Sequence, residues 1–594
     1  MKNYKNMNKE ELLELVEQLQ SRKKYGLVWE DKPEDVVEKC KEHLPVLEEV
    51  AERTLEKDEN GVTNLLIEGD NYHALSVLNY THAGKVDVIY IDPPYNTGNN
   101  SWRYNNDYVD SDDPYRHSKW LSMMAKRIEA SKNLLKEDGV LFLTIDDYEI
   151  FQIGLLLDEI FGEENRMGIV AIEINPRGRT TNKNFATSHE YILMYGRSSK
   201  SKVFDLPLTD EQKKNFGLED ETSNYRLLPF RRSGGLSVPK DRPNSEFFIA
   251  FEPKHKKIVG VGGSRIGSYK DQYKTDTVFV YGKKGSIEEC SIEDFRKSYP
   301  NINMIMPIDS NGKRRVWRWS DREKILRNAA EGEFVVKKVK GSYSVYLKDR
   351  TKSGRKPKTI WVDSLYDASS HGTNMLKNLF GGEKVFDYPK SLYAVIDTLK
   401  VSKAQKNKKV TILDFFAGSG TTAHAVLELN KQDGGNRQFI LCTNNENGIA
   451  EEVTYPRVEN VIEGYADVEG IPANLRYFKT TFVKQSEVSD DTRRELVKKS
   501  TEMICVKEGT YKKIYDNKKY KVYKNNDHLT GILFDLDSVK EFKEKVDAKD
   551  MPAHLYIFSL SHDTFEDDFA DLSVDHTLCP IPESILEVYR KLFA

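Results

Sequence analysis

The chain has 594 residues, with 90 basic and 94 acidic side chains and a formal net charge of −4. This length suffices for several domains, and the absence of any run of about 18 apolar residues excludes a membrane-spanning helix. The five cysteines show neither CxxC nor zinc-ligand spacing, so we expect no disulfide framework and no metal site, and because the amino terminus lacks the apolar core of a secretion signal we expect a cytoplasmic protein.

Residues 1–60 are predicted to form a helical extension. Asn8 can cap a helix over residues 8–20, because Glu11 follows three positions later. The apolar side chains of this helix fall on one face and are Leu12, Leu15, Val16 and Leu19. We interpret that face as packing on its own domain in preference to another chain.

Short apolar runs begin at about residue 61 and alternate with helical patterns. Strands are expected at 64–68, 86–91, 140–145, 169–174, 191–195, 410–413 and 438–443, and helices at 121–135 and from Thr421. Alternation of this kind predicts an α/β fold with a doubly wound, mostly parallel sheet and helices on both faces. The sheet is predicted in two parts, residues 61–200 and 376–480.

A basic segment separates these two parts, and we predict that residues 201–375 form an inserted domain. Residues 231–360 alone carry a net charge of about +15, so the rest of the chain is acidic. Basic side chains contact phosphates and guanine edges, and aromatic rings can stack on bases. The predicted nucleic-acid contacts are Arg231, Arg232, Arg314, Arg315, Trp317, Arg318, Lys352, Arg355 and Lys356. The charged and mixed residues 481–594 are predicted to form a separate C-terminal domain.

Residues 412–422 combine the end of a strand, a turn containing Gly418 and Gly420, and the start of a helix. Glycines let the backbone turn sharply and approach a ligand closely, as in the first turn of a doubly wound sheet that binds a nucleotide-like cofactor. A plain structural turn or a dinucleotide site would share this pattern. The spacing GxGxxG is absent, which disfavours NAD.

Asp92, Pro93, Pro94 and Tyr95 directly follow the predicted strand 86–91. Open α/β sheets place their reactive groups at this end of a strand. A rigid turn would account for the two prolines but not for the flanking Asp and Tyr. We therefore predict that these four residues form a catalytic turn.

The four residues suit methylation of an exocyclic amino group on a nucleobase. Such an amine is a poor nucleophile because its lone pair is conjugated with the ring. Asp92 and a backbone carbonyl near the prolines can accept both N–H bonds and direct the lone pair at a methyl donor, and Tyr95 can stack on the base. Because the target nitrogen lies inside the duplex, the base must be flipped out of the stack.

The two motifs, with Asp-Pro-Pro-Tyr first and Phe-Ala-Gly-Ser-Gly-Thr-Thr later, resemble those of the β-class amino methyltransferases. The longer matches at 90–98 and 414–426 are similar, more narrowly, to the modification subunits of type III restriction-modification systems. Further similar stretches lie at 67–71, 117–121 and 384–390, so the resemblance covers roughly residues 25–480. It implies a circularly permuted motif order and a target-recognition role for the insertion.

The resemblance also implies that the cofactor is S-adenosylmethionine. The glycine turn would hold its methionine end, Asp70 its adenine end, and residues 386–390 would close over it, while Glu446 is assigned to the ribose by position alone. The predicted cofactor residues are Asp70, Phe386, Asp387, Pro389, Lys390, Asp414, Phe416, Ala417, Gly418, Ser419, Gly420, Thr421, Thr422 and Glu446. His117 and Trp120 are interpreted as helix-start and packing residues.

The function that the resemblance implies is methylation of adenine N6 in double-stranded DNA. It further implies a homodimer and a separate restriction subunit with helicase and nuclease activity, and the chain itself has no Walker A sequence. Three alternatives stay open: a solitary adenine-N6 or cytosine-N4 methyltransferase, a DNA-binding specificity subunit with an inactive site, and an unrelated dinucleotide oxidoreductase. Asp at the head of the motif favours adenine by resemblance, because many cytosine-N4 enzymes have Ser there.

Overall fold

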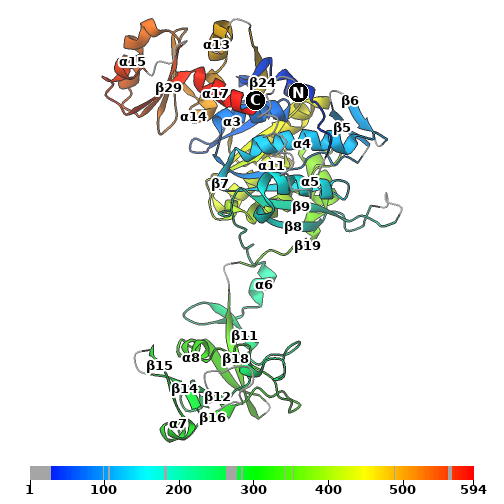
Figure 1. The fold of residues 1–594 in the computed structure, drawn as a ribbon, viewed down its shortest axis with the longest axis vertical. Helices are drawn as coiled ribbons and strands as arrows, with labels where there is room; N and C mark the ends of the chain where they lie inside the picture. The colour runs from blue at the N-terminus through cyan, green and yellow to red at the C-terminus, as the bar shows by residue number, and fades with distance from the viewer. Residues whose placement is uncertain are drawn as a thin grey trace, which may run out of the picture. The chain divides into compact units, whose positions relative to one another are not determined.

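The structure of the chain is a computed structural model with two compact units, Met1–Leu206 with Lys356–Ala594 and Pro207–Arg355 (Figure 1). It describes residues 29–97, 99–104, 107–110, 112–179, 184–262, 277–282, 285–339, 341–351, 354–486, 489–559 and 565–593. The helix predicted at 8–20 and the predicted DNA contact Lys352 lie outside the described residues. Within the described ranges, no helix combines the length and the hydropathy needed to cross a bilayer.

The larger unit is built on one sheet of 11 strands in the order β1, β24, β3, β21, β20, β4, β7, β9, β8, β19, with β2 also paired to β24. The six central strands are parallel and are β24 (Asn474–Lys484), β3 (Thr63–Glu68), β21 (Gln438–Thr443), β20 (Thr411–Asp414), β4 (Val86–Ile91) and β7 (Leu135–Ile145). The flanking strands are β1 (His43–Glu49), β2 (Leu55–Glu56), β9 (His189–Gly196), β8 (Arg166–Glu173) and β19 (Ile360–Trp361). The predicted mostly parallel sheet is therefore confirmed.

Helices cover both faces of this sheet, because its central strands are apolar on both sides. In β3, Leu65 and Ile67 pack into one hydrophobic core, and Leu66 between them packs into another. The first core includes residues of α3 (Asn71–Thr81), α4 (Arg116–Lys132), α5 (Ile150–Phe161), α14 (Thr501–Glu508) and α17 (Glu583–Phe593). The second includes residues of α9 (Met375–Leu379), α10 (Leu392–Lys400), α11 (Thr421–Asp433) and α12 (Tyr455–Glu463).

The helix predicted at 121–135 is displaced toward the N-terminus and is α4, Arg116–Lys132. It ends early because Leu134 turns back to bond the Ser131 carbonyl and Leu135 already begins β7. Further short elements of this unit are α2 (Asp35–Lys39), β5 (Asn99–Tyr104), β6 (Asp107–Asp110), β22 (Gly464–Tyr465), β23 (Val468–Glu469) and the π-helical turns Ser369–Asn374 and Ile449–Thr454.

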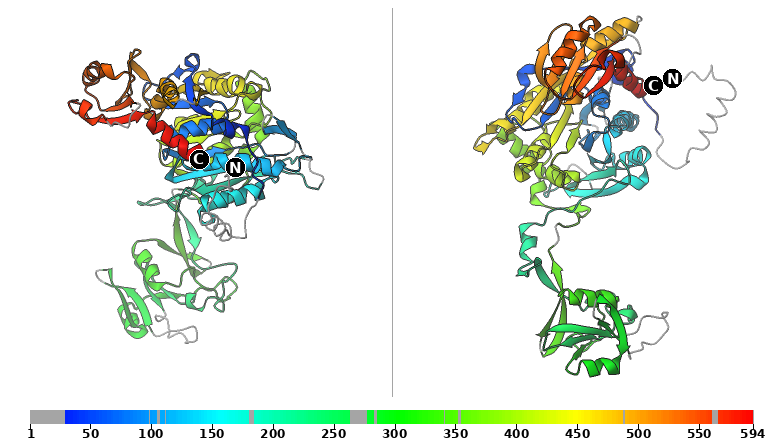
Figure 2. Two further views of the ribbon diagram at one scale, coloured as in Figure 1. Left: turned by 45° about the horizontal axis from the view of Figure 1, so that its top comes forward. Right: turned by 90° about the vertical axis from the view of Figure 1, so that its left-hand side faces the viewer.

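The smaller unit, drawn in green in Figures 1 and 2, contains two antiparallel sheets. One consists of β10 (Leu218–Glu219), β11 (Asn224–Pro229), β18 (Ser342–Arg350) and β17 (Phe334–Val339). The other consists of β15 (Ile287–Ser291), β14 (Thr277–Tyr281), β13 (Lys257–Gly262), β12 (Ile249–Glu252) and β16 (Asn303–Ile305). The α-helices among the described residues of this unit are α6 (Asp210–Lys214), α7 (Ile292–Ser298) and α8 (Arg322–Ala330). A core that includes Phe230, Trp317 and Ile325 joins residues of both sheets to α8.

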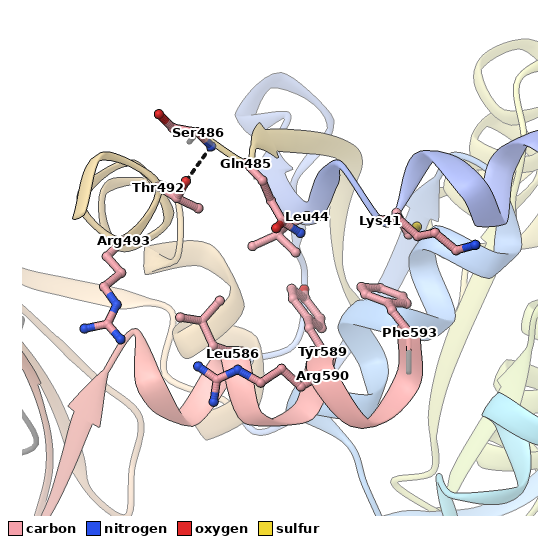
Figure 3. A pocket seen from close by; sticks show the side chains of 11 residues that line it. Lys41, Leu44, Gln485, Ser486, Thr492, Arg493, Leu586, Tyr589, Arg590 and Phe593 are labelled. Atoms are coloured by element: carbon pink, nitrogen blue, oxygen red, sulfur yellow. Dashed lines mark hydrogen bonds between the residues drawn. The ribbon is translucent and has the colours of Figure 1, made fainter. Parts of the chain in front are cut away.

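A second sheet of the larger unit lies near the C-terminus, drawn in orange and red in Figure 2. It consists of β25 (Lys512–Asp516), β26 (Tyr520–Lys524), β27 (Leu529–Leu533), β28 (Ala553–Phe558) and β29 (His576–Ile581), with α13 (Ser489–Lys498), α15 (Val539–Asp547) and α16 (Glu566–Phe569) as further helices. The last helix, α17, joins the main core, and its Tyr589 hydroxyl donates to the Pro45 carbonyl at 2.5 Å. A cavity of about 500 Å³ lies beside α17, and none of the predicted site residues lines it. Figure 3 shows side chains that line this cavity.

Candidate active site

The catalytic turn and the glycine turn leave neighbouring parallel strands at the same edge of the sheet. β4 leads into Asp92, β20 leads into the glycine turn, and their residues pair directly as Ile412 with Val88 and Leu413 with Ile89. The two motifs are thus adjacent in space although more than 300 positions separate them in sequence. This edge is where open α/β sheets bind ligands.

The Asp92 carboxylate is held by two side chains from other parts of the chain. Thr144 on β7 donates its hydroxyl to Asp92 Oδ1 at 2.6 Å, and Lys390 Nζ lies 3.1 Å from the same oxygen. Asp92 is about one-quarter exposed, with a side-chain accessibility of 26%. Its orientation is therefore set from one side while the group remains accessible.

Lys390 was predicted to hold the cofactor, and the structure places its ammonium on the catalytic turn. It forms an ion pair of 2.6 Å with Glu190 on β9 and also contacts the Tyr95 hydroxyl. Burial alone would lower the pKa of Lys390, but the charges of Asp92 and Glu190 outweigh it and raise that pKa. The lysine therefore carries a charge that balances two carboxylates.

The hydroxyl of Tyr95 is part of the same network. It donates to Glu190 Oε2 at 2.9 Å. Burial, reinforced by the charge of Asp92, raises the pKa of Tyr95 well above its usual range, so the phenol stays neutral. Sequence reasoning missed Thr144 and Glu190. The one available signal was Glu190 itself, an acidic residue directly before the apolar run 191–195.

The two proline carbonyls differ in what they contact. Trp120 on α4 is fully buried and donates its indole N–H to the Pro94 carbonyl at 2.7 Å. No donor from the described residues is hydrogen-bonded to the Pro93 carbonyl. Trp120 thus packs as predicted and also anchors the turn.

At the start of α4, His117 Nδ1 lies 2.5 Å from Glu149 Oε1, which also accepts from the Asn96 amide.

Replacing Trp120 with Phe tests whether anchoring the turn matters for turnover. Phe keeps most of the packing but donates no hydrogen bond, so the Pro94 carbonyl loses its partner and the turn loosens. We expect kcat for methyl transfer to fall about tenfold with little change in cofactor affinity.

Trp361→Phe is the matched control, because Trp361 is also buried and donates to a backbone carbonyl, that of Lys358, at 2.8 Å. Single-turnover measurements on both variants give the rate of methyl transfer, and cofactor titrations give the cofactor affinity. Equal losses in the two would refute a positioning role for Trp120.

The glycine turn has the geometry that the sequence predicts. Gly418 and Gly420 have φ angles of +49° and +77°, in the left-handed region that favours glycine. Asp414, predicted to bind the cofactor, lies behind the turn and is 2% exposed. It accepts the Thr422 hydroxyl at 2.6 Å and the Phe416 amide at 3.0 Å. Burial, helped by the charge of Asp92, raises the pKa of Asp414 to about 7.

The far side of the glycine turn is braced by Arg457, which sequence reasoning also missed. Its guanidinium is fully buried and donates to the Ser419 carbonyl at 3.2 Å and to the Thr421 hydroxyl at 2.8 Å. Burial lowers the pKa of Arg457 to about 9. The side chains of Ser419 and Thr421 thus face the protein.

Within the predicted closing segment 386–390, Phe386 contacts the glycine turn. A Cβ atom placed on Gly418 would lie 3.5 Å from the Phe386 ring, so the ring lies directly over the glycine. Pro389 is buried, whereas Asp387 is exposed and pairs with Lys384 at 2.6 Å. Phe386 and Lys390 therefore meet the two turns, and Asp387 faces solvent.

Asp70 caps α3 and is tied to a buried cation. Its side chain accepts the Tyr72 amide at 2.8 Å and lies 3.2 Å from Arg127, which also pairs with Glu34 at 2.7 Å. The next residue, Asn71, donates to the Phe415 carbonyl at 3.0 Å and so links α3 to the glycine turn. Glu446, in contrast, is exposed in a 3₁₀ turn after β21.

Removing Arg127 leaves two carboxylates without their cation. Arg127 is 3% exposed and Glu34 is 6% exposed, so the Ala variant leaves the negative charge of Glu34 buried and uncompensated. We expect Arg127→Ala to lower the free energy of unfolding by about 3 kcal/mol in urea denaturation.

The surface variant Arg166→Ala serves as the control for this prediction. Arg166 is about one-third exposed and pairs with Asp158 at 3.2 Å and with Glu163 at 3.1 Å. Its loss should lower the free energy of unfolding by less than about 1 kcal/mol. An equal loss in the two variants would contradict the assignment of Arg127 as a structural cation.

The predicted DNA contacts in the smaller unit come together in part. Arg231 pairs with Trp317 in an isolated β-bridge, so the two basic runs lie side by side. Trp317, however, is 1% exposed, stacks on Phe230 and donates to the Phe247 carbonyl at 2.7 Å. Its prediction as a base-stacking residue is wrong, because the ring fills the core of the unit.

Several of the predicted basic contacts have protein partners. Arg314 pairs with Glu246 at 2.5 Å and Arg315 with Asp309 at 2.8 Å. Three more donate to backbone carbonyls: Arg231 to that of Ile308, Arg232 to that of Gly235 at 3.2 Å, and Arg318 to that of Pro229 at 2.8 Å. Arg355 is half-buried, and Lys356 is exposed and belongs to the larger unit.

Comparison with known proteins places this geometry in a family. A family model described as DNA methylase matches residues 86–454, which include both motifs. The type II methyltransferase M.KpnI of Klebsiella pneumoniae is 33% identical over 64% of this chain and 79% of its own length. The EcoPI Mod subunit of Escherichia phage P1, a type III restriction-modification enzyme, is 31% identical over 74% of this chain and 66% of its own length.

A second Mod subunit, StyLTI of Salmonella typhimurium, is 28% identical over 70% of this chain, which spans only 58% of that relative. Among solved structures, the PvuII DNA methyltransferase (cytosine-N4-specific) is similar over 68% of this chain and 94% of its own, with a TM-score of 0.31 and 9% identity. The family model covers more than half of the chain, and the resemblance predicted from the motifs is confirmed. The chain belongs to the DNA methylase family.

Proposed function

We propose that this DNA methylase transfers a methyl group from S-adenosylmethionine to N6 of a flipped adenine, as the modification and specificity subunit of a type III restriction-modification system. The observation that carries the chemistry is the pairing of β4 with β20, which puts the catalytic turn beside the glycine turn. The EcoPI and StyLTI relatives, both named as Mod subunits, support the subclass.

The residues at the glycine turn fit the cofactor. S-adenosylmethionine supplies an electrophilic methyl group on a sulfonium. The turn has left-handed glycines that let a ligand approach the backbone, and the Phe386 ring next to Gly418 would cover that ligand. Gly418 and Phe386 would hold the methionine end, and Asp70 and Asn71, linked to the turn through Phe415, would border the adenine end.

The catalytic turn can bind and orient the target amine. Thr144 and Lys390 both contact Asp92 Oδ1, which leaves Oδ2 to accept one N–H bond, and the Pro93 carbonyl would accept the other. With both N–H bonds held, the nitrogen lone pair points away from them and toward the donor. As the N–C bond forms and the C–S bond breaks, the nitrogen gains positive charge. The Asp92 carboxylate accepts the proton that this nitrogen then loses.

Adenine is proposed over cytosine because the head of the motif is Asp and the type III relatives are Mod subunits. A second candidate is a solitary methyltransferase without a restriction partner, and M.KpnI favours it, since the chain spans more of that relative than of either Mod subunit. Both candidates share the same chemistry and differ in partner.

The remaining assignments belong to the same proposal. Residues 201–375 would recognise the DNA sequence, and the basic side chains beside the Arg231–Trp317 bridge would contact its phosphates. The enzyme would act in the cytoplasm as a homodimer with a separate restriction subunit. Residues 376–480 complete the cofactor part, and residues 481–594 form the C-terminal region.

Transfer of a labelled methyl group from S-adenosylmethionine to duplex DNA tests this proposal, with digestion of the product to nucleosides. We expect label in N6-methyladenine. Sequencing of methylated bases in a host that expresses the chain then gives the recognition site. Label in N4-methylcytosine would overturn the adenine assignment, and bound cofactor with no transfer to any DNA would favour an inactive specificity subunit.

A further inference from the structure

Three potential metal ligands converge in the C-terminal sheet, away from both catalytic motifs in the chain. Glu508 is the last residue of α14, His528 directly precedes β27, and His554 lies in β28. β27 and β28 are neighbouring parallel strands, paired from Leu529 with Ala553 onward, which brings the two histidines together. One ligand atom from each of the three side chains lies within 4.8 Å of the other two.

The ligand atoms share one carboxylate oxygen as their centre. Glu508 Oε2 lies 2.5 Å from His554 Nδ1 and 3.5 Å from His528 Nε2. The two imidazole rings are 4.6 Å apart between centroids and are tilted by 38°. His528 Nε2 is buried and has no aligned hydrogen-bond partner among the described residues. A buried nitrogen without a partner is costly unless a ligand satisfies it.

The carboxylate of Glu508 is held in place from its other oxygen. The Tyr556 hydroxyl donates to Oε1 at 2.5 Å, and Tyr556 is 1% exposed. This bond directs Oε2 at the imidazoles and restrains its rotation. Hydrogen bonds of this kind orient the carboxylate ligands of metal sites and raise metal affinity.

The surrounding charges narrow the choice of ion. Two lysines lie close: Lys85 Nζ donates to the Lys507 carbonyl at 2.9 Å, and Lys507 Nζ lies over the Tyr80 ring, 4.4 Å from its centroid. Their positive charges repel any metal ion, so only an ion that these ligands bind strongly would be held. Calcium and magnesium prefer oxygen ligands, whereas two imidazoles and one carboxylate suit zinc, with water in a fourth position.

We propose that Glu508, His528 and His554 bind a zinc ion that ties α14 to β27 and β28. The spacing of the cysteines predicted no metal site, and the cysteines take no part in this one. Its ligands, Glu508, His528 and His554, are 20 and 26 positions apart, outside the short spacings by which zinc sites are usually recognised in a sequence. The role we assign is stabilisation of the C-terminal sheet.

The test uses the full chain without a histidine affinity tag, dialysed against a chelator and then equilibrated with zinc. We expect one zinc per chain by elemental analysis, and a rise of about 5 °C in Tm with saturating zinc. Cobalt in place of zinc should give the visible absorption of a four-coordinate ion in the unmutated protein, a readout that needs no variant.

Variants then assign the ligands. His528→Ala and His554→Ala should each lose the bound zinc, and Tyr556→Phe should weaken its affinity about tenfold. His576→Ala, in β29 of the same sheet, and Cys579→Ser should keep it. Absence of zinc and of the cobalt spectrum from the unmutated protein would overturn the proposal, as would retention of zinc in both histidine variants or its loss in Cys579→Ser alone.

Discussion

Asp92→Ala is expected to reduce methyl transfer to DNA by at least about a thousandfold while the cofactor still binds. The variant removes the acceptor for one N–H bond of the target amine and for the proton that this amine loses. The glycine turn is braced by Arg457 and does not depend on Asp92. Single-turnover transfer of a labelled methyl group, with a separate titration of S-adenosylmethionine, measures the two quantities.

Two further variants make this result specific. Asp92→Asn keeps one acceptor oxygen but adds a donor and removes the charge beside Lys390, so we expect it to recover only part of the rate. Asp147→Ala, which removes an acidic residue that also follows a strand at this edge, should leave the rate within about twofold. Transfer by Asp92→Ala at the unmutated rate would exclude the proposed role of the catalytic turn.

Asp414→Asn is expected to raise stability increasingly as pH rises from about 4 to about 7. The pKa of this carboxyl is about 7 in the folded chain and 3.8 in its unperturbed state. Between these values the unfolded chain releases the proton and the folded chain keeps it, so stability falls with rising pH. Asn carries no proton to lose, and above pH 7 its advantage should reach about 4 kcal/mol.

The difference between the variant and the unmutated chain in urea denaturation, measured across this pH range, isolates the contribution of Asp414. Asp433→Asn is the control of opposite sign, because the hydrogen bond from Arg437 lowers the pKa of Asp433. The contribution of Asp433 is present at neutral pH and is lost as the pH falls through its lowered pKa. A pH-independent difference for Asp414→Asn would show that Asp414 is ionised in the folded chain.

Much of the catalytic fold could be predicted from local patterns. The strands at 86–91 and 438–443 agree with β4 and β21, and the helix from Thr421 begins where α11 begins. Apolar runs of this length, closed by Asp-Pro or glycine turns, are determined by neighbouring residues, and so is their parallel arrangement when helices alternate with them. For the same reason the ends of β4 and β20 could be identified as the site.

The partners of the catalytic turn could not be predicted in this way. Thr144, Glu190 and Lys390 come from three separate parts of the chain, and only the strand order β4, β7, β9 brings the first two beside Asp92. Lys390 was assigned to the cofactor because its motif resembles a closing segment. A motif records which residues recur together, whereas the atom that a long lysine side chain reaches depends on the packing around it.

The prediction for Trp317 failed for a related reason. An aromatic ring within a basic run is compatible with stacking on a base and with packing in a core, and composition does not separate the two. The ring turns inward against Phe230, and the neighbouring Val316 is also buried. Which side chains of such a segment enter the core depends on the segments that pack against it, and these are distant in the sequence.

The sequence by itself determined the reaction, because Asp92 to Tyr95 and the glycine turn at 418–420 are contiguous motifs whose chemistry is carried by adjacent residues. The tertiary structure alone decided how that chemistry is supported: which oxygen of Asp92 is held, which proline carbonyl is anchored by Trp120, and which side chains meet at Glu508. Contacts between residues far apart in the chain depend on strand order and on packing, and neither leaves a local pattern in the sequence.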